Sequence, residues 1–343
     1  MFEANEERFF EHDDYLNQIR QEKEELRKER IKIQTANVER NRIDRDISRQ
    51  ELYYEQIGLL CQALPLPDFQ PLFIEDVEYK KNYLLCISDL HYGAKFISEN
   101  NEYSPDIARE RLEFLTSRLY DFVREKHISH INIACLGDVI QGILRVSDLK
   151  LNDTTVVKSI VEISRLLALF LNCVSGFVEI DYYHVPSSNH TQMRPLGTKA
   201  SQIAEEDFEY VVGNYIKDLC ANNQRIHVHL AEDNKNYIEI DIEGYSVLAM
   251  HGHQIRNVDT ALRDISQVKQ EMIDYLILGH LHTNKLIPSG EGCCHDTEVF
   301  VCPSFVGSDP YSDSLMKGSK ASVKIFGFDE VYGCDETYKI ILN

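Results

Sequence analysis

From residue 83 onward, short runs of apolar and β-branched residues alternate with amphipathic segments, and this alternation limits the folds open to the chain. Ten runs are predicted strands: 83–88, 130–135, 178–185, 227–230, 237–242, 246–251, 275–279, 298–302, 322–326 and 338–342. Four segments are predicted helices: 105–126, 154–174, 201–222 and 258–272. The early part alternates strand with helix, as βαβ units do, and the later part has hairpin-like spacing. We therefore expect an α/β fold of two packed mixed β-sheets flanked by helices.

The N-terminal segment has a different composition. Residues 1–55 contain no Gly and no Pro, but 15 acidic and 11 basic residues. Its large apolar residues form a sparse stripe of Leu16, Ile19, Leu26, Ile31, Ile33, Val38, Ile43 and Ile47. This pattern predicts one long, solvated N-terminal helix, either a short coiled coil or a single helix lying along the domain. Three prolines in 64–73 end it, so we expect a helical extension at 1–63, a linker at 64–80 and a domain at 81–343.

Overall composition limits the classes of protein and the cellular compartments that are compatible with the chain. The net charge of −20 disfavours a generally basic nucleic-acid-binding surface, although a nuclease with a locally basic groove remains open. No apolar run approaches the roughly 18 residues of a membrane span, and the N-terminus lacks the layout of a secretory signal. Nine scattered cysteines do not make a disulfide framework. A cytoplasmic protein with no membrane partner is the expectation.

Five of the predicted strands are followed at once by metal-capable side chains. These side chains are Asp89, His91, Asp138, Asn189, His190, His251, His280 and His282. Taken singly, each is an ordinary turn former, helix cap or polar residue. Because ligands bind at the carboxyl ends of strands in open α/β sheets, five such sites predict one shared centre.

The order D-x-H, G-D, N-H, H, G-H-x-H resembles that of the calcineurin-like metallophosphoesterase family over about residues 89–282. The resemblance implies a four-layer αββα sandwich with two metal ions bridged by Asp138. It implies a first ligand set of Asp89, His91 and His282, and a second of Asn189, His251 and His280. It also implies that His190 is the catalytic histidine, which contacts the phosphate and protonates the leaving oxygen.

Two departures from the family pattern bear on the activity. Ser188 and Thr191 stand where the family has Gly and an acidic residue, which we expect to alter the orientation of His190. The chain also lacks the Asp-Arg-Gly segment of the family's protein phosphatases after Asp138, and it has the paired Gly-His-x-His that they lack. In this it is closer to the nuclease and phosphodiesterase branches, including the nuclease subunits of double-strand-break repair complexes. It is also similar to stand-alone phage members.

The donor set constrains the cofactor. Mixed imidazole and carboxylate ligation suits manganese, iron or zinc better than calcium or magnesium, and we expect manganese. Two cations about 3.5–4 Å apart stabilise both oxygens of an in-line displacement and bring the pKa of a coordinated water toward neutrality. A positioned His190 then supplies the acid.

Residues beside these motifs are candidate substrate contacts: Arg145, Arg194, Lys199, Arg256 and Lys285, with Tyr92 either stacking on a base or packing inside. We predict a DNA nuclease, either an exonuclease or a single-strand endonuclease. The alternative is a phosphodiesterase or phosphatase for a small nucleotide or phosphoprotein, and a more remote one is an inactive scaffold. We expect DNA or a nucleotide as substrate, self-association through the N-terminal helix, and no obligate ATPase partner.

Overall fold

The computed structural model describes residues 3–62, 81–142, 151–192, 206–232, 235–291, 296–314 and 318–342. The chain divides into two compact units, Met1–Leu64 and Pro65–Asn343. The predicted linker at 64–80 lies outside the described residues, so the three-part division of the chain stays a prediction. None of the helices in the described ranges is both long and apolar enough to cross a membrane.

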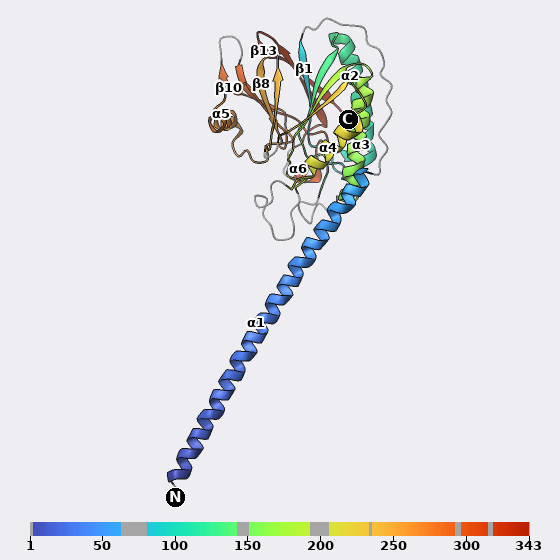
Figure 1. Cartoon of the computed structure of the whole chain (residues 1–343). Coiled ribbons are helices and arrows are strands. Elements are labelled where there is room, and N and C mark those ends of the chain that lie inside the picture. The colour runs from blue at the N-terminus through green and yellow to red at the C-terminus, as the bar shows by residue number, and fades with distance from the viewer. Residues whose placement is uncertain are drawn as a thin grey trace. The chain divides into compact units, whose positions relative to one another are not determined.

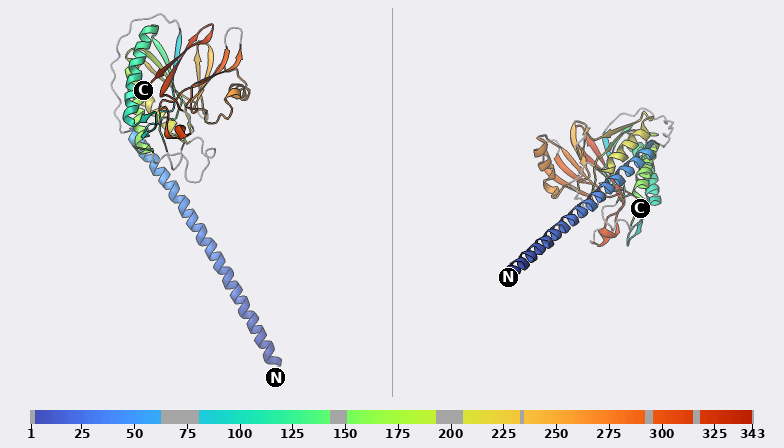
Figure 2. Two further views of the ribbon diagram at one scale, coloured as in Figure 1. Left: turned by 180° about the vertical axis from the view of Figure 1, so that it is seen from behind. Right: turned by 60° about the horizontal axis from the view of Figure 1, so that its bottom comes forward.

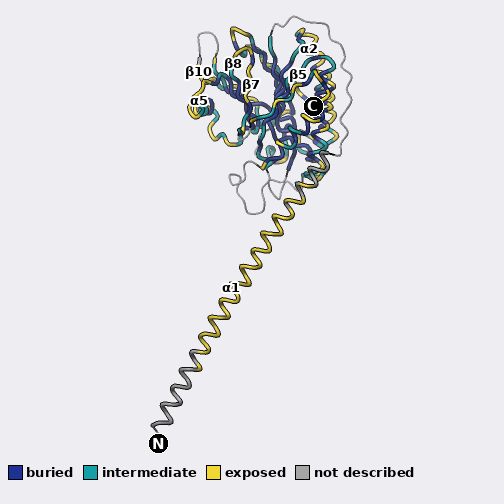
Figure 3. Tube along the Cα trace, viewed as in Figure 1, coloured by how far each residue is buried: buried dark blue, intermediate teal, exposed yellow. Residues whose placement is uncertain are grey.

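The first unit contains the single helix α1 (Glu3–Gln62), which confirms the predicted long N-terminal helix. Every side chain described along it is exposed (Figure 3). Pairs three residues apart bring opposite charges together, as at Glu29 and Lys32, whose charged atoms lie 2.7 Å apart. The coiled coil remains a prediction.

The second unit is built on two sheets (Figure 1). The first holds β1 (Asn82–Ile87), β4 (His130–Cys135), β5 (Glu179–His184), β6 (Ile226–Leu230), β12 (Ser322–Asp329) and β13 (Gly333–Ile341). Its strand order is β13-β12-β1-β4-β5-β6, with β1, β4, β5 and β6 mutually parallel. β1 is buried along almost its whole length because both faces of the sheet are covered, whereas the edge strand β13 alternates in burial.

The second sheet holds β7 (Ile238–Ile242), β8 (Tyr245–Met250), β9 (Tyr275–Leu278), β10 (Lys285–Glu291) and β11 (Asp296–Val301) in the order β10-β11-β9-β8-β7. The pair β2 (Phe96–Ile97) and β3 (Glu102–Tyr103) stands apart from both. Apolar side chains from the facing surfaces of the two large sheets form one core. Within it Phe300 and Phe326, one from each sheet, stack with ring centroids 4.4 Å apart.

Helices cover the two outer faces (Figures 1 and 2). α2 (Pro105–Lys126), α3 (Val156–Ser175) and α4 (Phe208–Cys220) lie over the first sheet, and α5 (Val258–Lys269) packs on β10 and β11 of the second. The short α6 (Pro310–Ser314) follows β11. The fold is therefore the predicted four-layer αββα sandwich.

Several elements differ from the sequence predictions. The helix expected from 201 begins at Phe208, because Asp207 caps it by accepting from the backbone N–H of Glu209. The helix expected to reach 272 ends at Lys269, where Gln270 takes a left-handed conformation. β10 was not predicted because Pro288 and a bulge before Gly290 interrupt its pattern, which an edge strand tolerates.

Candidate metal centre

The loops after β1, β4, β5, β8 and β9 meet at one edge of the sandwich and bring together all seven side chains predicted as metal ligands. The parallel pairing of β1, β4 and β5, and of β8 with β9, places these loops at the same end of the strands. Three groups of acidic and imidazole donors have ligand atoms within 4.8 Å of one another. The convergence predicted from the sequence is observed.

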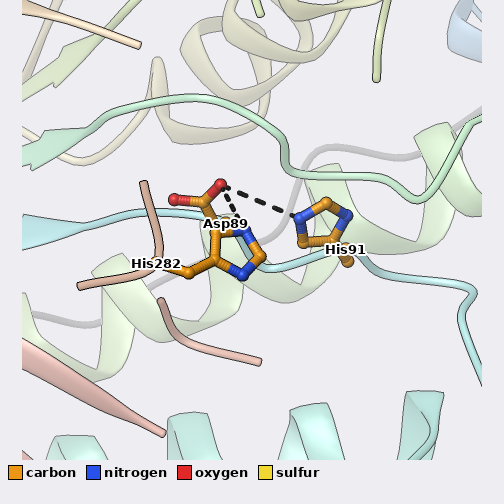
Figure 4. A group of neighbouring side chains, drawn as sticks. All are labelled: Asp89, His91 and His282. Carbon is orange, nitrogen blue, oxygen red and sulfur yellow. Dashed lines mark hydrogen bonds and ion pairs between the residues drawn. The ribbon is translucent and has the colours of Figure 1, made fainter. Parts of the chain in front are cut away.

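The first group is Asp89, His91 and His282 (Figure 4). Oδ1 of Asp89 lies 3.0 Å from Nε2 of His282 and 3.8 Å from Nε2 of His91, so one carboxylate oxygen faces both rings. The other oxygen, Oδ2, accepts from the backbone N–H of His280 at 3.1 Å and from the Ser88 hydroxyl. Those bonds fix the plane of the carboxylate, so Oδ1 points between the imidazoles.

The second group is Asp138, His251 and His280, with Asn189 beside it. Nδ1 of His251 lies 2.9 Å from the carbonyl oxygen of Leu136, which accepts only, so Nδ1 donates and Nε2 is the basic nitrogen. Nε2 lies 2.8 Å from Oδ1 of Asn189 and 3.1 Å from Oδ2 of Asp138. Electron-rich atoms approach so closely only around a shared proton or cation.

Electrostatics agree with that geometry. Burial alone would lower the pKa of His251, but the Asp138 carboxylate raises it to about 10, so a proton takes the place that a metal ion would take. Burial, with His251 beside it, lowers the pKa of His280 to about 4, which leaves that imidazole neutral and able to ligate. Burial would raise the pKa of Asp89, but His282 holds it well below its ordinary value.

Asp138 connects the two groups. Its Oδ2 is 3.1 Å from His251 in the second group and 4.0 Å from Nε2 of His91 in the first. The side chain is almost fully buried, and burial would raise its pKa, but His251 and His190 keep that pKa well below the ordinary value. Asp138 therefore lies between the two groups.

Backbone strain concentrates at this edge. Eight non-glycine residues in the described ranges have positive φ angles, and five of them are in the ligand set: Asp89, His91, Asp138, His280 and His282. The other three are in helix caps or a turn, where such angles are common. A left-handed conformation costs a residue with a Cβ about 1–2 kcal/mol, and such strain gathers at functional sites.

His91 provides the test of whether a metal ion fits. Its side chain is 5% exposed, and both ring nitrogens are buried without a hydrogen-bond partner among the described residues. A buried imidazole with two unmade hydrogen bonds costs free energy unless something else satisfies it. Nε2 of His91 faces the oxygens of Asp89 and Asp138, and a divalent cation there would satisfy all three groups.

His190 is half-buried and forms the third group with His91 and Asp138. Its backbone N–H donates to Oδ1 of Asp138 at 2.9 Å, and its Nδ1 donates to the Gln141 carbonyl at 2.9 Å. The ring packs edge-on against His91 with centroids 4.6 Å apart. Gly142 lets the chain pass here, because a Cβ on it would lie 1.9 Å from the His190 carbonyl oxygen. Because the Gln141 carbonyl only accepts, Nδ1 of His190 carries a proton in this arrangement.

The predicted substrate contacts differ in exposure, and three of them lie outside the described residues. Arg256 and Lys285 are exposed near the loops of the centre, while Arg145, Arg194 and Lys199 lie outside the described residues. Tyr92 is 3% exposed, and its hydroxyl donates to Glu162 at 3.2 Å. Tyr92 therefore packs inside the fold, and its proposed role of stacking on a base is corrected.

A buried arginine supports the centre and was missed from the sequence. Arg111 of α2 is 5% exposed and donates to the carbonyls of Phe305 and Val306 and to Oδ1 of Asn101. Val306 in turn donates its backbone N–H to the Asp89 carbonyl at 3.1 Å. No sequence signal marks Arg111, because its partners Phe305 and Val306 lie 194 and 195 positions away in the chain.

Comparison with known proteins gives one relative of substantial identity. The chain is 33% identical, over 99% of its length and 84% of the relative's, to the SPbeta prophage-derived uncharacterized protein YonJ of Bacillus subtilis (strain 168). No protein-family model matches the chain.

Solved structures give weaker similarity. A dimetal phosphatase from Danio rerio is 11% identical, with a TM-score of 0.35, over 77% of this chain and 100% of that one. Vps29 of Entamoeba histolytica, complexed with zinc, is 14% identical with a TM-score of 0.32, over 76% and 99%. A metallophosphoesterase from Sphaerobacter thermophilus is 15% identical with a TM-score of 0.31, over 72% and 84%. Similarity of this degree does not identify an activity.

Proposed function

We propose that this chain, which belongs to the same family as the prophage-derived YonJ protein of Bacillus subtilis, is a metal-dependent phosphoesterase that hydrolyses phosphodiester bonds. The observation that carries the proposal is the convergence of seven donors from five strand ends. Buried, strained and partly unsatisfied side chains of this kind are costly for a fold that does not use them.

The residues divide into two ligand sets that share Asp138. Asp89, His91 and His282 would hold one divalent cation, and Asn189, His251 and His280 the other. When bound, such cations supply Lewis-acid charge for phosphoester hydrolysis. We propose manganese, because it accepts both imidazole and carboxylate ligands.

His190 would act as the general acid. Its Nδ1 is committed to the Gln141 carbonyl, and the bond from its backbone to Asp138 fixes it relative to both ligand sets. From that position Nε2 holds the proton that the leaving oxygen takes as the ester bond breaks.

Within this class we propose a DNA nuclease acting on single strands or ends. The exposed Arg256 beside the second ligand set supports an anionic substrate. A small nucleotide is the second candidate, favoured by the net charge of −20, which opposes the approach of a long polyanion.

A substrate panel with the purified chain in manganese separates these cases. It contains single- and double-stranded DNA, RNA, cyclic nucleotides and an aryl phosphodiester, with Asp138→Asn as the metal-site control. A nuclease digests DNA and loses binding steeply as salt rises, whereas a nucleotide enzyme leaves DNA intact. Absence of hydrolysis of every substrate with manganese, iron or zinc would refute the proposed activity.

A further inference from the structure

Two carboxylates of α4 lie directly beneath the loop that carries Asn189 and His190. Asp207 is the N-cap of α4 and is 8% exposed, and Glu209 in its first turn is fully buried. Neither belongs to the ligand groups. Their contacts lead toward the centre rather than to solvent.

Asp207 holds the loop on both sides of His190. Its Oδ2 accepts from the backbone N–H of Ser188 at 3.0 Å, and its Oδ1 accepts from the hydroxyl of Thr191. The backbone of Thr191 is held as well, because its carbonyl accepts from the N–H of Phe208 at 3.1 Å. Asn189 and His190 are therefore the two residues of a short bridge whose ends are both fixed to the start of α4.

Glu209 joins that bridge to the loop of Asp138. Its Oε1 accepts from the Ser188 hydroxyl at 2.8 Å and from the backbone N–H of Val139 at 3.2 Å. Val139 follows Asp138 directly, so one carboxylate oxygen contacts the loops of both ligand sets. The other oxygen, Oε2, lies 2.8 Å from Nε2 of His184, whose Nδ1 contacts the Tyr182 hydroxyl at 2.8 Å.

Burying a pair of carboxylates costs more free energy than burying apolar side chains that would pack the same space. Ionised groups removed from water need hydrogen bonds or opposite charge to be tolerated, and apolar residues would fill the same space at lower cost. Apart from the cap bond from the backbone N–H of Glu209 to Asp207, the bonds made in return go to the two loops and to His184. Their geometric effect is to set the spacing between Asp138 and the residues Asn189 and His190.

We infer that Asp207 and Glu209 are positioning residues, which hold the Asn189–His190 bridge against the Asp138 loop so that the general acid and the second ligand set keep one geometry. They act through Ser188, Thr191 and Val139 and contact neither substrate nor metal. The inference rests on the proposed function for its catalytic consequence, but its structural part stands without it.

The test uses the full chain with Asp207→Asn, Glu209→Gln and, as a matched control on the exposed side of the same helix, Asp218→Asn. Hydrogen–deuterium exchange is followed in the peptide spanning residues 186–192, which contains the His190 amide bonded to Asp138. We expect exchange there to quicken roughly two- to tenfold in the two test variants, the factor for one lost hydrogen bond. Peptides from β12 should be unchanged.

Activity supplies the second readout. With an aryl phosphodiester, the test variants should lose roughly tenfold or more in kcat with little change in KM, because misplacement of the acid affects the chemical step. Thr191→Val replaces by a methyl group the hydroxyl that bonds Asp207 and Ser188. This variant is used in place of the carboxylate variants if those fail to fold. Thr191→Ser, which keeps that hydroxyl, should restore kcat.

The outcomes separate the two claims. Exchange in 186–192 that is the same in Asp207→Asn, Thr191→Val and Asp218→Asn would overturn the positioning role, whatever the activity. A wild-type chain that hydrolyses nothing while Asp207→Asn still loosens 186–192 would refute the phosphoesterase proposal and leave the positioning role in place.

Discussion

The Asp138 carboxylate accepts a hydrogen bond from the backbone N–H of His190 at 2.9 Å, although the two residues lie 52 positions apart in the chain. The same carboxylate faces His251 with its other oxygen. One side chain thus fixes the proposed acid relative to both ligand sets. Its charge and its shape both matter, and they can be separated by mutation.

Asp138→Asn keeps the shape and removes the charge. We expect the variant to retain fewer than two manganese ions per chain, because the shared carboxylate is lost from both ligand sets. Metal analysis of dialysed protein measures this, with Asp121→Asn, an exposed carboxylate of α2, as the control. Two ions retained in Asp138→Asn would show that the charge is not needed.

His190→Ala should separate chemistry from metal binding. We expect the metal content to stay at the wild-type value, because the hydrogen bond from His190 to Asp138 comes from the backbone N–H, which the substitution keeps. The kcat should fall by roughly 10²- to 10⁴-fold, the usual contribution of a positioned general acid. Steady-state kinetics on an aryl phosphodiester measure this, and wild-type turnover would exclude His190 as the acid.

Arg111→Met should destabilise the fold through unsatisfied acceptors. The guanidinium serves the carbonyls of Phe305 and Val306 and the Asn101 side chain, and methionine fills its space without donors. We expect the free energy of unfolding in urea to fall by about 1–3 kcal/mol. Arg118→Met, at a side chain 54% exposed on the same helix, should change it little.

The free energy of unfolding should depend on pH through Glu336. Burial would raise its pKa, but the Tyr338 hydroxyl, Lys81 and Lys126 lower it to about 2, below the ordinary value of 4.5. A depressed pKa stabilises the fold above the unfolded value, and this stabilisation is lost as pH falls from about 4.5 toward 2. Wild type should therefore exceed Glu336→Gln in urea stability at pH 6 and approach it at pH 3. An equal difference at both pH values would contradict this.

Most of the strands and the convergence of the candidate ligands could be predicted from the sequence because they rest on local signals. The apolar run at β4 and the Gly137–Asp138 turn after it are contiguous, and Gly137 has the φ of +90° that a tight turn needs. The contacts of Asp207 with Ser188 and of Arg111 with Phe305 join residues 19 and 194 positions apart, and no local pattern encodes them. Tyr92 was ambiguous because its neighbours in sequence do not reveal that Glu162 covers it.

Deleting residues 1–63 tests the role of α1. The nine large apolar residues described along it are between 37% and 71% exposed. We propose that they pair with a second copy, so the truncated chain should have a lower solution mass than the full chain by light scattering. Equal oligomeric states would remove this proposal and leave the metal centre unaffected.

Anomalous diffraction from crystals grown with manganese addresses the central claim most directly. The account predicts two strong peaks: one against Asp89, His91 and His282, the other against Asn189, His251 and His280, with Asp138 reaching both. A well-ordered map in which these side chains keep their places and no peak lies among them would contradict it.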